Sequence, residues 1–396
     1  MKIVIYTTEP FPIGYAATNR ILSYCYGFLK NDVSVLVITT SSKVKSLKRV
    51  KHIFGNDRRL KCVGIPFIQT KVTRRIHKWL LYLLYPIILE ILLSRAKYDA
   101  IIFYGNDSFH ERLAVDSKDR HNIPVVKEES EYPYMRFPFR CDEETVDAKN
   151  AAVLKKYDSY SGVLSMTNPI RDYLLKVGIN SEKVEIIPHT VIWKRFEYSH
   201  AQDRTRFREY ILYTGSFSNH KDGTLNLIEA FDIVHSSHPE IGIVLAGFGS
   251  LQQHKKLLDR VHFLGLSTCV QIIKNVPNTM VPNLICNAKV LVSPRPYSVQ
   301  AEFGFPTKVV EYLASGKPVV TTAYGDLSEH IEDKKNAFMV IDSQPLSIAE
   351  AILYVLDNYD EASAVAKNGA DLVKRCFDPK INTQLIIDYM KKLTQD

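Results

Sequence analysis

The chain has 396 residues, which is too long for one ordinary hydrophobic core and predicts two domains of roughly 150–200 residues each. An apolar content of 46% and a charged content of 24% are ordinary for a soluble globular protein. Six scattered cysteines form no CxxC pair and no metal-ligand spacing with histidine, so we expect free thiols in a reducing, cytoplasmic compartment. The N-terminal residues 1–11 are predicted to form a strand, because they lack the apolar core and cleavage site of a signal peptide.

The net charge of +8 is unevenly distributed. Residues 1–200 contain 31 Lys and Arg against 21 Asp and Glu, whereas the remainder contains 20 against 22. Most of the excess lies in residues 43–78, which contain twelve basic residues and a single acidic one, Asp57. A region of this kind suits an anionic partner such as a membrane surface.

Short apolar runs alternate with helical patterns along the whole chain, which predicts parallel, doubly wound sheets. In the first half the predicted strands are residues 2–8, 33–40, 99–105, 124–129, 162–167 and 183–191. The pattern starts again after a polar linker near residues 200–206, with strands at 209–216, 241–249, 270–276, 289–294, 317–322 and 337–341. We therefore expect domains at 1–200 and 207–376 and an amphipathic helix at the C-terminus, within 377–396.

One segment of the second half, AEFGFPTKVVEYLASGKPVVTT (301–322), predicts a loop, a helix, a turn and a strand. Gly304 and Pro306 mark the loop, and the apolar residues that follow recur at helical spacing. Gly316, with a proline two residues later, is expected to end the helix. We expect the first backbone N–H groups of the helix to be free, so that they and the helix dipole favour an anion.

This segment resembles the nucleotide-sugar site of retaining glycosyltransferases of family 4. The resemblance implies a GT-B fold, in which two Rossmann-like domains face a cleft and the last helix crosses back to the N-terminal domain. It also implies that Glu311 binds the ribose of a donor nucleotide. At the position of the family's first motif glutamate this chain has Phe303. Glu302 lies one residue earlier, and it is our candidate for contact with the donor sugar.

Further loops of the second half extend the resemblance. In YTGSFSNHKDG (213–223), Gly215 and Lys221 match the family's diphosphate-binding loop, while Ser216 stands where the family has an arginine. We expect Arg295 to replace that cation, because a departing nucleoside diphosphate needs preorganised positive groups. The loop that follows the strand at 270–276 contains Asn275 and Val276, which the resemblance places beside the nucleobase.

The candidate donor-binding residues also include one position in the first half. The loop 9–20 matches the family's first N-terminal loop, in which Gly14 would let the backbone approach the donor closely. The full set is Gly14, Gly215, Asn275, Val276, Gly304, Phe305, Pro306, Thr307, Lys308 and Glu311.

The acceptor side is predicted from the first half. The loop KEESEYPYMRF (127–137) contains Glu128, Glu129 and Glu131, of which Glu131 joins Lys221, Arg295 and Glu302 as a candidate catalytic residue. The basic region leads into the apolar segment 79–93, which is too short and too interrupted to span a bilayer. Two interpretations stay open: a membrane-surface helix whose candidate contacts are Arg74, Arg75, Lys78 and Trp79, or a buried helix beside a solvated loop.

The sequence thus predicts a retaining, metal-independent glycosyltransferase without a cofactor, in which a nucleoside diphosphate sugar is the donor and a glycan or lipid-linked sugar the acceptor. We expect it in the cytoplasm, in polysaccharide synthesis, with peripheral membrane contact and no nucleic-acid partner. Two alternatives remain: a nucleotide-sugar epimerase of the same architecture, and a non-catalytic protein that binds membrane or nucleic acid through its basic region.

Overall fold

The computed structural model describes residues 1–40, 50, 53–64, 74–132, 143–197 and 205–394. The chain forms two compact units, one made of Met1–Thr190 and Pro379–Asp396 and the other of Val191–Asp378. The first unit therefore ends ten residues before the linker that the sequence suggested at 200–206. Most of that stretch lies outside the described residues. The backbone N–H of Val191 donates to the carbonyl of Phe377 at 3.0 Å, which ties this residue to the second unit.

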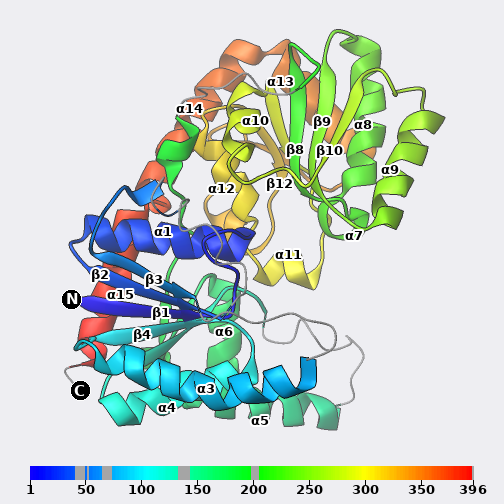
Figure 1. Ribbon diagram of the computed structural model, residues 1–396. Helices are drawn as coiled ribbons and strands as arrows, with labels where there is room; N and C mark the ends of the chain where they lie inside the picture. The colour runs from blue at the N-terminus through cyan, green and yellow to red at the C-terminus, as the bar shows by residue number, and fades with distance from the viewer. Residues whose placement is uncertain (41–49, 51–52, 65–73, 133–142, 198–204, 395–396) are drawn as a thin grey trace. The chain divides into compact units, whose positions relative to one another are not determined.

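The described strands of the first unit form one parallel sheet in the order β3-β2-β1-β4-β5-β6-β7 (Figure 1). Their bounds are β1 Lys2–Thr7, β2 Ser34–Thr39, β3 Leu60–Gly64, β4 Ala100–Tyr104, β5 Val125–Glu129, β6 Gly162–Ser165 and β7 Val184–Ile186. The helices are α1 Ala16–Lys30, α3 Arg74–Ser94, α4 Ser108–His121, α5 Glu143–Asp158, α6 Asn168–Val177 and α15 Pro379–Leu393. The inner strands are apolar and buried almost end to end, as strands covered by helices on both faces require.

The edge strand β3 was not predicted from the sequence. It has only five residues, LKCVG, and lies inside the basic region, so it has no continuous apolar run. Its side chains are half-buried or exposed because it pairs on one side only, with β2. Five of the other predicted strands of the first half are confirmed, whereas the sixth, predicted at 183–191, forms only the three-residue strand β7.

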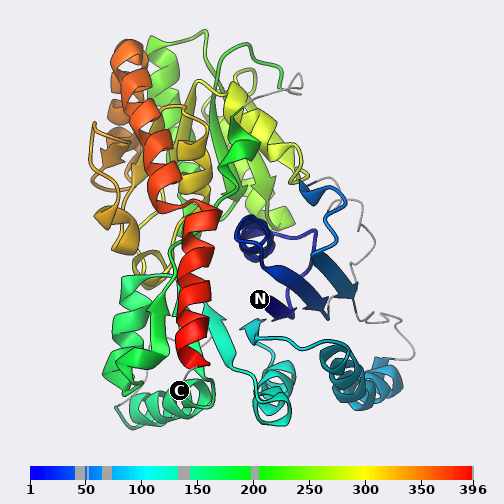
Figure 2. The same ribbon diagram turned by 90° about the vertical axis from the view of Figure 1, so that its left-hand side faces the viewer.

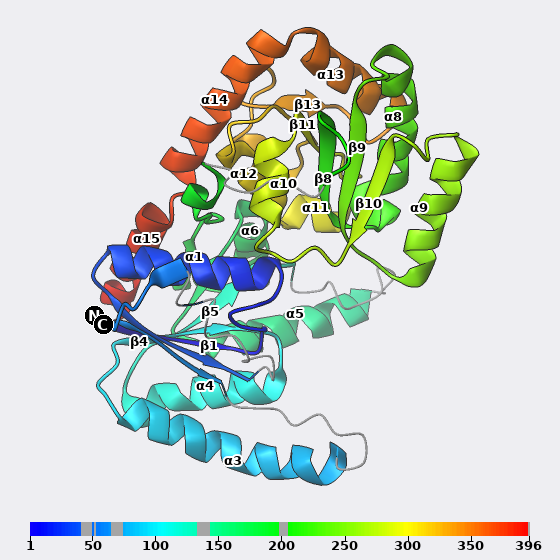
Figure 3. The ribbon, with the colours of Figure 1, turned by 45° about the horizontal axis from the view of Figure 1, so that its top comes forward.

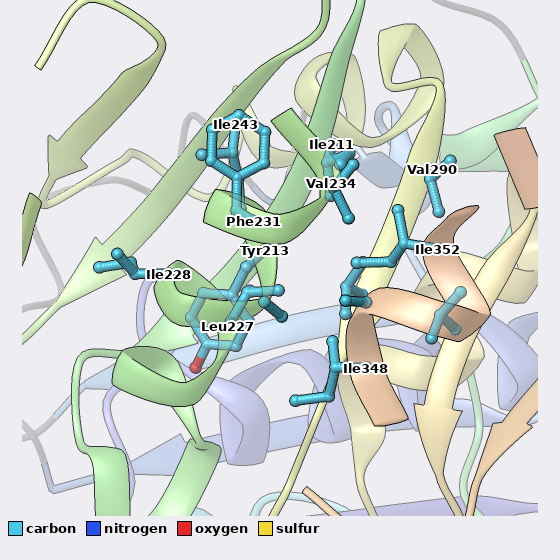
Figure 4. Close-up of a cluster of buried hydrophobic side chains, with 14 of the residues drawn as sticks. Ile211, Tyr213, Leu227, Ile228, Phe231, Val234, Ile243, Val290, Ile348 and Ile352 are labelled. Atoms are coloured by element: carbon cyan, nitrogen blue, oxygen red, sulfur yellow. The ribbon is translucent and has the colours of Figure 1, made fainter. Parts of the chain in front are cut away.

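The second unit repeats the architecture with a parallel sheet in the order β10-β9-β8-β11-β12-β13. Its strands are β8 Tyr210–Ser216, β9 Gly242–Phe248, β10 Val270–Lys274, β11 Val290–Ser293, β12 Val319–Thr322 and β13 Phe338–Val340. Its helices are α7 Asn219–Asp222, α8 Thr224–Ser237, α9 Leu251–Phe263, α10 Val281–Asn287, α11 Val299–Phe303, α12 Thr307–Ala314, α13 Pro345–Asp357 and α14 Tyr359–Cys376. Figure 4 shows the core formed by α8, α13 and the central strands, in which Phe231, Ile243 and Ile352 are fully buried.

The last helix, α15, belongs to the first unit, where it packs along α1 (Figure 2, red). Gly27 of α1 makes this close contact possible, because a Cβ at that position would lie 2.1 Å from the carbonyl oxygen of Pro379. At the end of α1, the Asn31 side-chain amide donates to the carbonyl of Lys380 at 2.8 Å and to the hydroxyl of Thr383 at 3.0 Å. The predicted return of the C-terminal helix to the N-terminal part of the chain is therefore present.

Candidate functional site

The centre of the candidate site is an ion pair between α12 and the loop that follows β8. The Lys308 ammonium lies 2.5 Å from an Asp222 carboxylate oxygen and 3.1 Å from the hydroxyl of Tyr213. It also lies over the Tyr213 ring, 4.4 Å from the centroid. The side chains of Lys308 and Asp222 are only 19% and 7% exposed, so this charge pair is largely removed from water.

The short helix α7 determines which residues of its loop face this pair. The Ser218 side chain caps its N-terminus by accepting from the backbone N–H of Lys221 at 3.3 Å. Gly223, at φ +68°, ends it in the left-handed conformation. Asp222 is buried as a result, whereas the neighbouring Lys221 is exposed. Lys221 thus brings a solvent-accessible cation next to the buried pair.

Gly215 provides the space that Lys308 occupies. It has φ +145°, a region that favours glycine, and a Cβ there would lie 2.4 Å from the Lys308 nitrogen. The sequence matched this glycine to the family's diphosphate-binding loop. In the structure, the Lys308 ammonium group occupies the space that a side chain at this position would fill.

Arg295 supplies a further cation at the carboxyl end of β11. Its Nη2 donates to the carbonyl of Gln300 at 2.7 Å, and its own carbonyl accepts from the Thr322 hydroxyl at 2.7 Å. Its Nε is buried and has no hydrogen-bond partner among the described residues. Gly304 lies beside it, since a Cβ there would be 3.8 Å from the Arg295 Nη2. One donor of the guanidinium is thus buried without a partner among the described residues.

Burial dominates the electrostatics of this group. It lowers the pKa of Lys308, and the carboxylate of Asp222 opposes that shift while the charges of Arg295 and Lys221 add to it. Burial also lowers the pKa of Arg295, again opposed by Asp222. The Asp222 carboxylate thus acts on both Lys308 and Arg295, and Lys221 adds a third positive charge nearby. A bound anion would relieve both the desolvation and the mutual repulsion of the cations.

The N-terminus of α12 differs from the prediction of free backbone donors. The N–H of Thr307 donates to the carbonyl of Phe305 at 2.9 Å, and the N–H of Val309 donates to the carbonyl of Pro306 at 2.9 Å. The prediction was wrong for these two groups because the loop folds back on the helix start. Side-chain cations, rather than these two N–H groups, therefore supply the positive charge.

The other predicted residues of this segment lie at the same edge of the sheet. Phe305 is 6% exposed and packs against Phe377, with 5.6 Å between the ring centroids, so its side chain anchors the loop. Glu311 is half-buried in the second turn of α12, which ends as predicted, with Gly316 at φ +66°. Glu302 is half-buried in α11. Its backbone lies so close to Gly325 that a Cβ on Gly325 would be 2.0 Å from the Glu302 carbonyl oxygen.

The predicted base-binding residues follow β10, two strands from β8. Asn275 is exposed and has φ +54°, and its N–H donates to the carbonyl of Gly247 at 2.7 Å. Val276 is half-buried. The sheet order thus places Asn275 and Val276 on one side of β8 and the cation-bearing strand end of β11 on the other.

In the first unit, the acidic residues at the end of β5 and just after it divide into buried and exposed carboxylates. Glu128 is fully buried and accepts from Arg20 at 2.7 Å and from the Tyr24 hydroxyl at 2.8 Å. Glu129 is buried and accepts from the hydroxyl of Tyr157. Both were considered for contact with a substrate, and the structure gives them internal partners instead. Glu131 is exposed.

Two further predicted groups belong to the first unit. A Cβ on Gly14 would lie 2.0 Å from the Thr18 hydroxyl, which itself donates to the carbonyl of Pro10 at 2.6 Å, so the glycine allows a tight turn into α1. The backbone of Arg74, Arg75, Lys78 and Trp79 forms the first turns of α3.

Sequence reasoning missed two features of the site. Asp222 was overlooked because the resemblance of the loop 213–223 rested on its glycine and its cation, Gly215 and Lys221. A pair of tyrosines was also missed: Tyr297, 66% exposed, lies edge-on to Tyr324 with 5.4 Å between the ring centroids. These rings follow β11 and β12, and spacing alone gave no signal that the two loops meet.

The fold class is confirmed as GT-B, with two parallel-sheet α/β units. The chain is similar in fold to HepE of Anabaena in complex with UDP (TM-score 0.71, 15% identity, 99% of this chain and 100% of that chain). It is also similar to sucrose-phosphate synthase of Thermosynechococcus elongatus (TM-score 0.72, 14% identity, 99% of each chain). At these identities the likeness concerns the fold alone.

The family-model match lies in the second unit. Residues 196–372 match the family model described as glycosyl transferases group 1. The chain is 26% identical over 193 residues to D-inositol 3-phosphate glycosyltransferase of Paenarthrobacter aurescens, which covers 46% of this chain and 45% of the relative. It is 30% identical over 158 residues to an uncharacterised glycosyltransferase of Methanocaldococcus jannaschii, which covers 40% and 38%. The matches span less than half of each curated relative, and together with the fold they support a glycosyltransferase.

Proposed function

We propose that the protein is a retaining glycosyltransferase of family 4 that transfers a sugar from a nucleoside diphosphate sugar to a glycan or lipid-linked acceptor in polysaccharide synthesis. The observation that carries the proposal is the ion pair of Lys308 with Asp222 after the carboxyl end of β8, together with Arg295 and Lys221, whose charges act on the same ammonium group. Ligands of doubly wound sheets bind at such strand ends.

The proposed chemistry makes direct use of these cations. The bond between the anomeric carbon and the diphosphate oxygen breaks, and a bond to an acceptor hydroxyl oxygen forms on the same face of the sugar. The hydroxyl proton passes to the departing diphosphate. Negative charge therefore grows on the diphosphate during the reaction, and preorganised cations in a partly desolvated site stabilise it. In this scheme the cations carry that charge without a metal ion.

The likeness to relatives supports the choice of donor. HepE has been solved with UDP-glucose, with a TM-score of 0.70 and 16% identity to this chain. TarM of S. aureus, also similar in fold, has been solved with UDP and a saccharide, with a TM-score of 0.71 and 13% identity. We propose by analogy that a nucleoside diphosphate occupies the cation cluster of this chain, with Asn275 and Val276 beside the base and Glu311 on the ribose.

A thermal-shift and calorimetry screen against UDP, GDP, ADP, CMP and TDP, with and without Mg²⁺, tests the proposal. We expect one nucleoside diphosphate to raise the melting temperature with or without the metal, and its nucleotide sugar to be consumed when a glycan acceptor is added. No shift with any nucleotide would contradict the proposal. Conversion of the nucleotide sugar to an isomer without acceptor would assign the same site to an epimerase.

A further inference from the structure

Large apolar side chains are exposed at several places in the described part of the chain. None of them belongs to a membrane span, since no helix in that part has the length and apolar character to cross a bilayer. One of them, Tyr297, follows Arg295 by two residues and is 66% exposed. Its ring meets that of the half-buried Tyr324 edge-on, with 5.4 Å between the centroids and 74° between the planes. We call these two residues the tyrosine pair.

Gly223 brings the loop of Tyr297 against the loop that carries Asp222. It ends α7 directly after Asp222, with φ +68°. A Cβ there would lie 2.2 Å from the carbonyl oxygen of Pro294 and 3.5 Å from the Cδ of Pro296, the residue before Tyr297. The absent side chain therefore lets the loop of the tyrosine pair pack directly against the loop of the buried ion pair.

The loop of Tyr324 is tied to the same place. Gly325 has φ +56°, and because it lacks a side chain its backbone can pack on that of Glu302 in α11. The Thr322 hydroxyl donates to the carbonyl of Arg295 at 2.7 Å and so joins the end of β12 to the end of β11. Figures 1 and 3 show α11 (yellow) at the ends of the strands of this unit. These contacts hold both loops before a ligand binds, as a preorganised binding surface requires.

The order of the strands places the tyrosine pair on one side of the cations. Along the sheet β10-β9-β8-β11-β12-β13, the candidate base residues follow β10, the loop of Asp222 follows β8 and Arg295 follows β11. Tyr297 and Tyr324 follow β11 and β12. In a nucleoside diphosphate sugar the diphosphate lies between the base and the sugar. A donor whose base lies after β10 and whose diphosphate lies on the cations therefore has its sugar towards the tyrosine pair.

The chemistry of the two side chains suits a sugar ring. The C–H groups on one face of a pyranose pack against the flat face of an aromatic ring, and the hydroxyl of a tyrosine can exchange hydrogen bonds with sugar hydroxyls. Two rings set edge-on offer a flat face and a polar edge at one place. A tyrosine that is two-thirds exposed beside a cation cluster also leaves room for a ligand to cover it.

We propose that the tyrosine pair is the surface on which the sugar of the donor packs. The assignment rests on the proposed function and deepens it, because it adds two aromatic rings to a sugar contact for which the sequence offered only Glu302. The sugar covers the Tyr297 ring when the donor binds. The tyrosine pair therefore contributes to the affinity for a nucleotide sugar and not to the affinity for the nucleoside diphosphate alone.

A comparison of UDP with UDP-sugars separates the sugar contact from the rest of the donor. Calorimetry measures UDP, UDP-glucose, UDP-galactose and UDP-N-acetylglucosamine on the full chain, or the matching set if the nucleotide screen selects another base. Tyr297→Ala and Tyr324→Ala should leave the affinity for the diphosphate unchanged. They should weaken the tightest-binding nucleotide sugar by roughly three- to tenfold, the range for the loss of one packed ring. Tyr297→Phe keeps the ring and should keep most of that affinity.

The matched control is Phe263→Ala, which removes another exposed aromatic ring of the same unit. Phe263 is 76% exposed and ends α9 before β10 begins, so it lies at the opposite edge of the sheet from the candidate site. This variant should bind the diphosphate and the nucleotide sugars like the unmodified chain. Equal melting temperatures of the variants without ligand would show that a lost affinity is not a lost fold.

Each contrary outcome has a distinct meaning. Equal weakening of the diphosphate and the nucleotide sugar by Tyr297→Ala would overturn the assignment and place the tyrosine pair on the base or the diphosphate. Unchanged donor affinity with a raised KM for a glycan acceptor would place it on the acceptor instead. Unchanged behaviour throughout would remove the pair from the site. If no nucleoside diphosphate binds the unmodified chain, the proposed function itself fails, whereas normal binding without a tyrosine effect refutes this inference alone.

Discussion

The ammonium of Lys308 and the carboxylate of Asp222 lie 2.5 Å apart although 86 residues separate them in the chain. The contact links the loop after β8 to the first turn of α12, and it uses the space left by Gly215. It holds a buried cation in a defined position before any ligand binds. Preorganisation of this kind is what makes a charged group effective towards a ligand or a developing charge.

Removal of the Lys308 charge should weaken the binding of nucleoside diphosphate. Lys308→Gln deletes a charge-assisted interaction worth about 1.5–3 kcal/mol, so calorimetry should show a loss of roughly ten- to 150-fold in affinity. The matched control is Lys289→Gln in the same unit, since Lys289 is also paired with a carboxylate, Glu209 at 2.8 Å, and lies over a tyrosine ring. The control should leave affinity unchanged, and equal effects of both variants would remove Lys308 from the site.

Affinity for nucleoside diphosphate should fall as the pH rises through the lowered pKa of Lys308. An anion binds the protonated amine more tightly, so binding is strongest below that pKa and weakens above it. Asp222→Asn removes the carboxylate that raises this pKa, so the decline of nucleoside diphosphate affinity with pH should begin at a lower pH. Calorimetric titrations between pH 7 and 10 measure the effect, and identical profiles for the two proteins would contradict the electrostatic coupling.

Gly215→Ala should disturb binding through Lys308. The new methyl group would meet the ammonium, and the backbone at φ +145° would be strained. Gly265→Ala is the control, because Gly265 also has positive φ, +71°, but a Cβ there meets no atom within 4 Å. Both variants should lower the melting temperature, and only Gly215→Ala should lower affinity for the diphosphate. Loss of affinity in both would point to general strain instead.

The buried pair in the first unit should matter for stability. Arg20 and Glu128 are 2.7 Å apart with side chains 2% and 0% exposed, and Arg20 also donates to the carbonyl of Ile187 at 2.9 Å. Arg20→Met leaves a buried carboxyl without its cation and should lower the free energy of unfolding by about 3–5 kcal/mol in urea denaturation. Arg20→Met with Glu128→Leu should recover much of this loss, whereas Arg59→Met, at an exposed pair, should have a much smaller effect.

The pH dependence of the stability of Arg20→Met gives a second measure of the interaction between Arg20 and Glu128. Burial raises the pKa of Glu128, and Arg20 opposes that shift. Without Arg20 the folded-state pKa should rise further above the unfolded value, so the folded protein binds more protons in that window. Stability of Arg20→Met should therefore decline as the pH rises from about 4 towards neutrality. A flat profile relative to the unmodified chain would mean that Glu128 finds another cation.

The sequence was informative wherever one strong local pattern sufficed. The strands β8 and β9 are long apolar runs because both faces are buried, and the end of α12 was readable from Gly316. The short edge strand β3 lacks such a run and was missed. Glu128 and Glu129 looked like site residues because they are acids at a strand end, but only the packing of α1 and α5 shows that Arg20 and Tyr157 engage them.

In the candidate site, too, some residues could be predicted from the sequence and others could not, because their contacts depend on packing. Lys221 and Arg295 were predicted as diphosphate contacts from the resemblance to the family's loop, and Lys308 from its place at the start of the helix. Asp222 was not, since its partner Lys308 comes from another loop and the pairing depends on how α7 turns. The N-terminus of α12 was expected to offer its backbone donors, but the carbonyls of Phe305 and Pro306 already accept from two of them.

The position of α15 has a consequence for how the chain is made. The ribosome synthesises the first 190 residues long before the helix that covers α1, and the whole second unit emerges in between. Until residues 379–394 leave the exit tunnel, the surface of α1 around Gly27 and Asn31 has no cover. The first unit therefore cannot be completed before the whole second unit has been synthesised, although it contains the first 190 residues of the chain.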